Sequence, residues 1–428
     1  MKEIEIKTKL DNELNIIIAI CLIGIFFEGF LCSLPIFGSS IKIILCILSL
    51  FLIAVIFPIC RNVKRDNIYP TLNVLFISAY VISNLVSGQY NTRSTTVASI
   101  RFLLLLLSYI ILMNLSKWQM IYIRLLYAFG MLFILTTIWL TYDTASYERY
   151  FSYSMYPNSA FNFIRGTQGG HTAGITDHYS HNGIMLGNSL VVIFSFFMVR
   201  RKKRVHLFFI ILNVIAMVMC GKRAQVLFPI MAIALAYMIY SKKNLKTILL
   251  TITILIVLLI LTIILYNNNI TFQNYINRYS DMDEDGSVLS RFSYWQIAFD
   301  HFRQRPIFGN GWLSYRSFHP RNQDAHNNYV QLLCDVGITG EIVFCSFFIY
   351  NLFAAYKNLL FAAKFRNDLQ DDIALLCLFS FIYQVYFLLY AITGNPLQLL
   401  YSFCPYIAAC AISIFYKNYF SSEKFTEI

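Results

Sequence analysis

The chain has 428 residues, of which 58% are hydrophobic and only 13% are charged. A soluble domain could not bury that much apolar surface, so the composition excludes a water-soluble globular protein and makes lipid part of the solvent. The formal net charge of +12 does not require nucleic acid as a partner, because short basic loops beside anionic lipid headgroups account for most of it.

Stretches of about 20 mainly apolar residues are long enough to cross a bilayer. Twelve candidate spans follow one another along the chain: Ile16–Cys32, Ile41–Cys60, Thr71–Ser87, Val97–Leu115, Met120–Tyr142, Tyr179–Val199, Val205–Gly221, Ala224–Tyr240, Leu245–Tyr266, Thr339–Tyr356, Asp372–Ile392 and Pro396–Tyr416. We therefore expect an all-α polytopic membrane protein with about 12 transmembrane helices, forming a single integral membrane domain over residues 1–428.

The distribution of Lys and Arg predicts the orientation of these spans. Basic residues gather at the termini and in alternate loops, for example Arg200–Arg204 and Lys242 with Lys243. By the positive-inside rule this side is cytoplasmic, and the even number of spans places both termini there. We also expect the first apolar segment to be retained as an anchor, because a small-residue cleavage site is lacking. Two loops on the outer side, residues 143–178 and 267–338, have room for a site.

The second outer loop differs from the cytoplasmic loops in its basic residues. The cytoplasmic loops use mostly lysine, whereas all the basic residues of this outer loop are arginines. They are Arg278, Arg291, Arg303, Arg305, Arg316 and Arg321. Guanidinium groups bind phosphate oxygens in pairs, so this bias suggests that a diphosphate or another anion is handled outside. The alternative is that these arginines only reach toward lipid headgroups. Six of the seven histidines, including His178 and His181, also lie on the outer side.

Residues Ser290–Pro306 have the pattern of an amphipathic helix, with Ser290 as N-cap and Pro306 as the stop. Its apolar stripe predicts that it lies on or in the outer membrane interface: Phe292, Trp295, Ala298, Phe299 and Phe302. The following PIFGNGW predicts a tight turn back toward the membrane.

The segment DAHNNYVQLLCDVGITGE, Asp324–Glu341, predicts a short helix that begins at Asn327 or Asn328 and ends at Gly337 and Gly340. The positive end of a helix disfavours a second positive charge, so we expect His326 to be neutral near pH 7. A neutral imidazole can accept a proton, which makes His326 a candidate general base. Asn327 could orient His326 or hydrogen-bond a sugar hydroxyl. The alternative is that these residues only cap the helix.

Two further groups of cations lie at the membrane edge. In CGKRAQV, Lys222 and Arg223 stand between two predicted spans on the outer side, against the charge rule. Arg101 lies about a turn inside the fourth predicted span. Charged residues at such depths are functional candidates by default, although exposed side chains that reach the interface are a competing explanation.

Several of these segments resemble motifs of one family. RFSYWQIAFDHFRQRPIFGNGW followed by HNNYVQLLCDVGITG resembles the principal motif of the O-antigen ligase and O-antigen or capsule polysaccharide polymerase (Wzy-like) superfamily of bacterial membrane proteins. CGKRAQ resembles its arginine-containing turn, and TDHYSHNGIMLG resembles a segment of polymerase-like members. Asp335 stands where many members have Glu, and Lys222 precedes Arg223 where Ser or Thr is common.

The resemblance implies a GT-C-like architecture and an inverting glycosyltransferase that needs no metal or other cofactor. It also implies an undecaprenyl-diphosphate-linked oligosaccharide as donor, membrane lipid as surroundings, and a chain-length regulator and flippase of the same pathway as partners. The active site would be extracytoplasmic, on the bacterial cytoplasmic (inner) membrane.

On this basis the predicted function is polymerisation of repeat units, with His326 and Arg291 as catalytic residues. The predicted substrate-binding residues are Arg223, Lys222, Arg101, Asn327, Arg316, His178 and His181. The TDHYSHNGIML segment favours a polymerase. A ligase that uses a lipid A–core acceptor is the first alternative, and a flippase without chemistry is the second. Against the flippase, the polar residues gather at the outer edge of the membrane rather than at its middle.

Overall fold

The structure is a computed structural model. It describes residues 2–26, 105, 107–110, 112–115, 117–152, 172–176, 178–200, 203–241, 287–320, 322–366 and 369–421. The predicted spans at 41–60, 71–87 and 245–266 lie outside these residues, as do Arg101, Arg278 and Arg321.

All regular elements in these ranges are helices, which confirms the all-α class. Their bounds are α1 (Lys2–Phe26), α6 (Lys117–Tyr142), α7 (Thr144–Ser152), α9 (Tyr179–Val199), α10 (Lys203–Cys220), α11 (Arg223–Tyr240), α14 (Ser287–Gln304), α15 (Ser314–Phe318), α16 (Asn328–Lys364), α17 (Asp371–Tyr390), the 3-10 turn η2 (Pro396–Gln398) and α18 (Leu400–Phe420). Within these ranges, seven helices are long and apolar enough to cross a membrane: α6, α9, α10, α11, α16, α17 and α18. The protein is therefore a multi-pass membrane protein.

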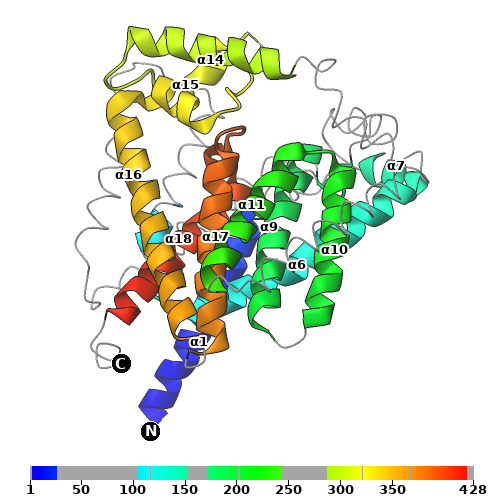
Figure 1. Cartoon of the computed structure of the whole chain (residues 1–428), viewed down its shortest axis with the longest axis vertical. Coiled ribbons are helices and arrows are strands. Elements are labelled where there is room, and N and C mark those ends of the chain that lie inside the picture. The colour runs from blue at the N-terminus through cyan, green and yellow to red at the C-terminus, as the bar shows by residue number, and fades with distance from the viewer. Residues whose placement is uncertain are drawn as a thin grey trace.

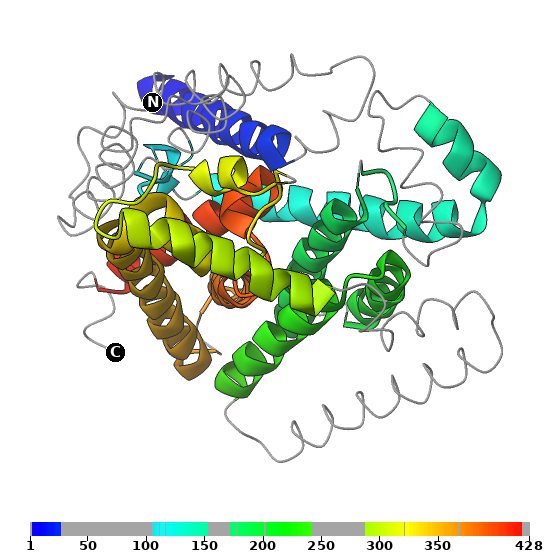
Figure 2. The same ribbon diagram turned by 90° about the horizontal axis from the view of Figure 1, so that it is seen from above.

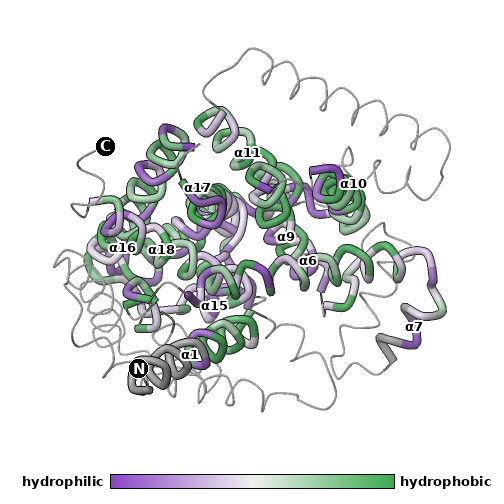
Figure 3. Tube along the Cα trace, turned by 90° about the horizontal axis from the view of Figure 1, so that it is seen from below, coloured by the Kyte–Doolittle hydropathy of each residue, from purple (hydrophilic) through white to green (hydrophobic). Residues whose placement is uncertain are grey.

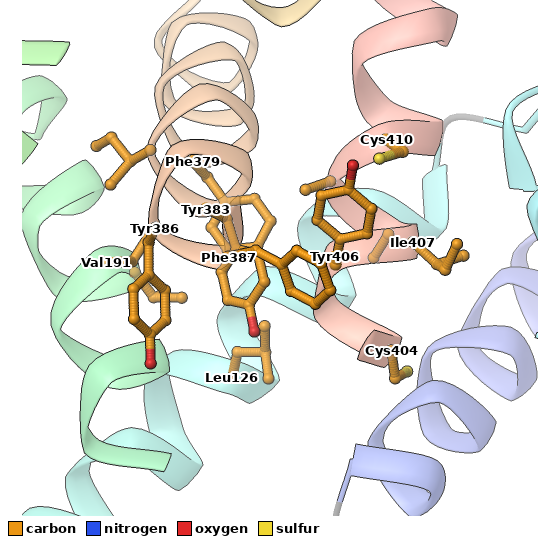
Figure 4. Close-up of a cluster of buried hydrophobic side chains, with 14 of the residues drawn as sticks. Leu126, Val191, Phe379, Tyr383, Tyr386, Phe387, Cys404, Tyr406, Ile407 and Cys410 are labelled. Atoms are coloured by element: carbon orange, nitrogen blue, oxygen red, sulfur yellow. The ribbon is translucent and has the colours of Figure 1, made fainter. Parts of the chain in front are cut away.

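Three of the spanning helices form the centre of the bundle. In the most apolar stretch of each helix, 78% of the residues are buried in α9 and in α17 and 89% in α18, compared with 28% in α10 and in α11. Side chains of α6, α9, α17 and α18 meet in one apolar cluster (Figure 4). Figure 3 shows the hydrophobic stretches of helices at the periphery of the bundle, such as α6 and α11. Lipid would cover the exposed faces of α10 and α11, since these faces carry apolar side chains such as Phe208 and Leu227.

The helices α14 and α15 lie across one end of the bundle, above α16 and α17 (Figures 1 and 2). Helix α1 begins at the opposite end (Figure 1). With its 37 residues, α16 would be about 55 Å long if straight, which exceeds the roughly 30 Å of a hydrocarbon core. Its first turns therefore extend beyond the apolar layer toward α14 and α15.

A kink at Gly337 joins two segments that the sequence analysis treated separately. Helix α16 contains both the predicted short helix and the predicted span Thr339–Tyr356, and at Gly337 the backbone leaves the helical region with φ 67°. The neighbouring turn supplies partners for the backbone at the kink. Asn310 N and Gly311 N donate to Cys334 O at 3.0 Å and Asp335 O at 2.8 Å, and Ile338 N donates to Pro306 O at 2.9 Å.

Glycine is required on both sides of this contact. Gly309 and Gly337 both have positive φ, and a Cβ on either would collide with the facing backbone, Asp335 O for Gly309 and Ile307 O for Gly337. The predicted turn PIFGNGW is thus confirmed, and its function is to hold α14 and the kinked α16 backbone to backbone.

Helix α14 corrects the prediction for Ser290–Pro306 in two respects. It begins at Ser287, so the prediction that Ser290 is the N-cap was wrong. The predicted apolar stripe is also divided: Ala298 is 1% exposed against the protein, whereas Phe292 is 60% and Phe299 40% exposed on another face. The cause is helical spacing, because Phe292, Gln296, Phe299 and Arg303 follow one another along a separate stripe.

Candidate active site

The loop that carries His326 is fixed on both sides. Trp295 Nε1 donates to Ala325 O at 3.1 Å, and Ala325 N donates to Gln331 Oε1 at 3.0 Å. On the other side Asn328 N donates to Ala391 O at 2.8 Å. His326 itself has φ 52°, a conformation that is uncommon for residues other than glycine. The backbone therefore presents the imidazole in one defined direction at the N-terminal end of α16.

Asn327 is the N-cap of α16, as one of the two alternatives predicted. Its side chain accepts hydrogen bonds from Tyr329 N at 3.1 Å and Val330 N at 3.2 Å. The capping oxygen is thus committed to the helix. His326 lies one residue before the cap, which leaves its ring outside the helix and exposed.

The surroundings of His326 favour the neutral imidazole. The pKa of His326 is lowered to about 4, mainly because the neighbouring protein removes water from the ring; Asp324 raises the pKa, and Lys222, Arg291 and His319 contribute to lowering it. Although His326 is exposed in part, other groups lie close to its ring, among them the Tyr294 ring, which is stacked at 6.1 Å between ring centroids. The expectation of a neutral histidine agrees with this pKa, but desolvation is the main cause.

Lys222 and Arg291 are electrostatic neighbours of this imidazole, and Arg223 is a neighbour of Arg291; we call Lys222, Arg223 and Arg291 the cationic cluster. Arg291 is half-buried in α14, and Arg223 opens α11, with Lys222 as the residue before it. Burial lowers the pKa of Arg291, and nearby Arg223 lowers it further, against the influence of Tyr390. Among the described residues no carboxylate forms an ion pair with Arg291. The cluster is thus rich in positive charge, a suitable environment for an anion.

Arg316 has a different environment from Arg291, although both belong to the loop predicted over residues 267–338. Its Nε lies 2.5 Å from Asp324 Oδ1 and its Nη2 lies 2.7 Å from Asp324 Oδ2, with Gln398 Oε1 at 3.4 Å from Nη2. Burial would lower the pKa of Arg316, but the hydrogen bond and charge of Asp324 raise it overall. Much of its charge is therefore matched by a carboxylate of the chain.

His178 and His181 stand at the beginning of α9, beside the cationic cluster. His178 is the N-cap of α9, and its Nδ1 accepts from Ser180 N at 3.0 Å. Its ring stacks on Tyr179 at 4.2 Å, and the same tyrosine ring lies 4.6 Å from Lys222 Nζ. The ring of His181 lies 4.7 Å from the ring of Tyr401, measured between centroids. The segment TDHYSHNG thus reaches the cluster through Tyr179.

The sequence alone did not give a role to every residue that builds this end of the bundle. Asp335 is fully buried and joins α16 to α15, because its carboxylate accepts from Leu313 N at 3.1 Å, Ser314 Oγ at 3.0 Å and Tyr315 N at 2.9 Å. Tyr390 stands beside Arg291. An acidic residue two positions before a kink glycine was the available signal for Asp335, whereas nothing local marks Tyr390.

A bundle of spanning helices with a histidine and several cations at one end defines an integral membrane protein with a polar site at a membrane face. A family model described as O-antigen ligase matches residues 207–345, a range that contains the cationic cluster and His326. This match confirms the predicted resemblance to the O-antigen ligase and Wzy-like superfamily, whose members are glycosyltransferase-like enzymes. No curated protein matches the chain.

Proposed function

We propose that the protein is a polysaccharide polymerase, which transfers a glycan from a polyprenyl diphosphate to a hydroxyl of an acceptor sugar. The observation that carries this proposal is the proximity of His326, with its lowered pKa, to Lys222 and Arg291. A base and an anion-binding group side by side are the two requirements of a transfer that removes a hydroxyl proton and releases a diphosphate.

In the proposed reaction, His326 accepts the proton of the acceptor hydroxyl as its oxygen attacks the anomeric carbon. The bond between that carbon and the diphosphate oxygen breaks, and polyprenyl diphosphate leaves with the bonding electrons. Because attack comes from the face opposite the leaving group, the anomeric configuration inverts. The products are the extended glycan, the carrier diphosphate and a protonated His326, which then returns its proton to water.

The cationic cluster would stabilise the negative charge that develops on the diphosphate. Arg291 and Arg223 are the principal groups, with Lys222 beside them. Loss of one positioned electrostatic donor typically costs about 100-fold or more in rate. Diphosphate is already a good leaving group, so guanidinium charge can take over the work of an acid catalyst.

The remaining predicted residues contribute around this centre. His178 and His181 could contact the sugars, since they flank Tyr179 beside Lys222. Arg316 would hold Asp324 and the loop before His326 in place, and only in a second role would it meet the diphosphate. We propose that the α14 end faces the outside of a bacterial cytoplasmic membrane and that both termini are cytoplasmic, on the evidence of the loop lysines.

A ligase that transfers finished glycan to lipid A–core is the second candidate, and the description of the matching family model favours it. Both enzymes would use the same donor and the same base. They differ in the acceptor, so the reaction product distinguishes them.

The test uses purified protein in detergent with a polyprenyl-diphosphate-linked repeat unit. A ladder of longer lipid-linked glycans would support the polymerase. Transfer that occurs only after lipid A–core is added would replace it with the ligase. If neither product forms, while labelled substrate crosses the bilayer of reconstituted vesicles, the protein is a transporter and the proposal fails.

A further inference from the structure

Two glycines of α9 allow the beginning of α11 to pack unusually close. Gly183 and Gly187 are one helical turn apart, and a Cβ on Gly183 would lie 3.1 Å from Gln225 Cγ and 3.2 Å from Lys222 Cβ. A Cβ on Gly187 would lie 2.5 Å from the Tyr386 hydroxyl. The turn that carries Lys222 and Arg223 is thus seated in a groove that larger side chains would fill.

Gln225 occupies the floor of this groove and links two helices. It is 2% exposed, and its Oε1 accepts a hydrogen bond from the Tyr386 hydroxyl of α17. The Tyr390 hydroxyl, one turn further along α17, also interacts with the Gln225 side chain. Figure 4 shows Tyr386 projecting from α17 into the buried cluster. The side chain that follows Arg223 by two positions is therefore bound to the outer end of α17.

Tyr390 continues this connection to the other side of the cationic cluster. It is an electrostatic neighbour of Arg291. Its ring is held in place, because a Cβ on Gly394 would lie 2.6 Å from the ring carbons, and its partner ring Tyr386 stacks at 6.4 Å with an angle of 21°. Polar and electrostatic interactions thus connect the Arg223 turn through the buried Gln225 and the half-buried Tyr390 to Arg291.

Such a connection has a physical purpose, because like charges repel. Arg223 and Arg291 are close enough to influence each other electrostatically, and in the absence of a bound anion this repulsion favours their separation. A clamp for a diphosphate needs both guanidinium groups at a fixed spacing, since the ligand carries two phosphoryl groups. Contacts of neighbouring side chains would help to hold this spacing against the repulsion.

We propose that Gln225, together with Tyr386 and Tyr390, is a positioning residue that fixes the separation of Arg223 and Arg291, so that both bind one diphosphate at the same time. This inference rests on the proposed function, which makes the cationic cluster the diphosphate site. It predicts a selective effect: loss of the connection weakens binding of diphosphate, which needs both arginines, more than binding of monophosphate, which needs one.

The chain offers a matched control on the same helix. Tyr383 is also a fully buried phenol of α17, and its hydroxyl donates to Ser402 O at 3.1 Å and lies 2.8 Å from Asn188 Oδ1. Neither partner belongs to α11 or to the cationic cluster. Tyr386→Phe and Tyr383→Phe therefore each remove one buried hydroxyl from α17, but only the first removes a contact to the Arg223 turn.

The experiment measures the affinities of inorganic diphosphate and inorganic phosphate by calorimetry, on the purified full chain in detergent. We expect Tyr386→Phe to lose about tenfold in diphosphate affinity, the scale of one charge-assisted contact, with phosphate affinity unchanged. Tyr383→Phe should keep the wild-type ratio of the two affinities. Leucine has a volume similar to that of glutamine, so Gln225→Leu removes the interactions with both tyrosines without opening a cavity. This variant should show the same selective loss, and it replaces Tyr386→Phe in the test if Tyr386→Phe does not fold.

Two outcomes would overturn the inference in different ways. If wild type binds diphosphate and all three variants keep its ratio of affinities, the connection does not set the spacing and the proposed function is untouched. If wild type binds no diphosphate, the cationic cluster is not its site, and the proposed function falls together with the inference.

Discussion

Arg291 and Arg316 come from the same predicted outer loop, residues 267–338, but have opposite surroundings. Arg316 is matched by Asp324 through two nitrogen atoms, whereas Arg291 is half-buried near Arg223 and Tyr390. Arg316 holds the loop that leads to His326, and the carboxylate of Asp324 neutralises much of its charge. In the proposed function, Arg291 keeps its charge for the diphosphate. On that proposal the arginine-rich loop combines structural and binding roles, and the position of Asp324 separates them.

The largest effect should come from Arg291, which forms no ion pair with a carboxylate among the residues that the structure describes. Arg291→Ala should lower the transfer rate by about 100-fold or more, because an electrostatic donor is lost from a desolvated site. Arg303→Ala is the control on the same helix, since Arg303 is exposed and pairs with Asp300, and it should leave the rate nearly unchanged. Rates are measured in the purified system at equal protein amounts. Undiminished polymer from Arg291→Ala would end the assignment.

The buried carboxylate that supports this region should matter for stability. Asp335→Asn keeps the shape of the side chain but loses its charge and offers one acceptor to three donors. The substitution weakens hydrogen bonds to a charged group and leaves a buried donor without an acceptor. We therefore expect it to lower the free energy of unfolding by about 2 kcal/mol. Thermal unfolding in detergent measures it, with Ser314→Ala as a milder comparison. An unchanged melting temperature would show that the carboxylate does not hold α15 to α16.

The pH dependence tests the surroundings of His326. Because its folded-state pKa is about 4 rather than 6.5, the imidazole stays neutral well below neutral pH. We expect kcat/KM to remain constant from pH 8 to about 5.5 and to fall only as the pH approaches 4. Lys222→Gln, which removes one of the charges that lower this pKa, should move the midpoint upward. A wild-type midpoint near 6.5 would contradict the account.

The same pKa has a consequence for stability, with a defined sign. The unfolded chain takes up the His326 proton near pH 6.5, whereas the folded protein does so only near 4. Between these values the unfolded state binds more protons, so acidification from 6.5 toward 4 favours unfolding. Rates at low pH are therefore taken immediately after dilution from neutral buffer.

The smallest effect should come from the paired arginine. Arg316→Ala should cost no more than about 1 kcal/mol in stability, because the pair with Asp324 is partly exposed. Its effect on the rate should be far below that of Arg291→Ala. In a double-mutant cycle, Arg316→Ala should add little once Asp324→Asn is present. A loss of rate as large as that of Arg291→Ala would instead give Arg316 a direct role at the diphosphate.

Much of this architecture could be predicted because membrane spans depend on local composition. The bounds of α9 agree with the predicted Tyr179–Val199, and the motif around His326 was placed correctly at a helix start. The kink at Gly337 was predicted as a helix end, because glycine signals an interruption without showing that the helix resumes. The start of the last span was also predicted too early. The prediction began it at Pro396, but Pro396 belongs to a 3-10 turn and α18 begins at Leu400, because proline is compatible with both a helix start and such a turn.

The candidate site was predicted less completely, for a physical reason. Cations and histidines stand out against an apolar sequence, so Arg291, Arg223 and His326 could be proposed directly. Gln225, Tyr386 and Tyr390 could not, because a buried glutamine or tyrosine is ordinary in a membrane helix until its partner across the bundle is known. Likewise, only the folded chain separates Arg316 from Arg291, since Asp324 lies eight residues from Arg316 in the sequence and gives no sign of the pair.

The central claim is that His326 acts in the chemistry and does not serve only as part of a helix start. The most direct measurement is a gel of surface glycan and lipid-linked intermediates from cells that lack the protein, complemented with wild type or His326→Ala at matched membrane level. We expect cells with His326→Ala to contain only single repeat units. Long lipid-linked chains left untransferred would make the protein a ligase, and normal glycan from His326→Ala would contradict the claim.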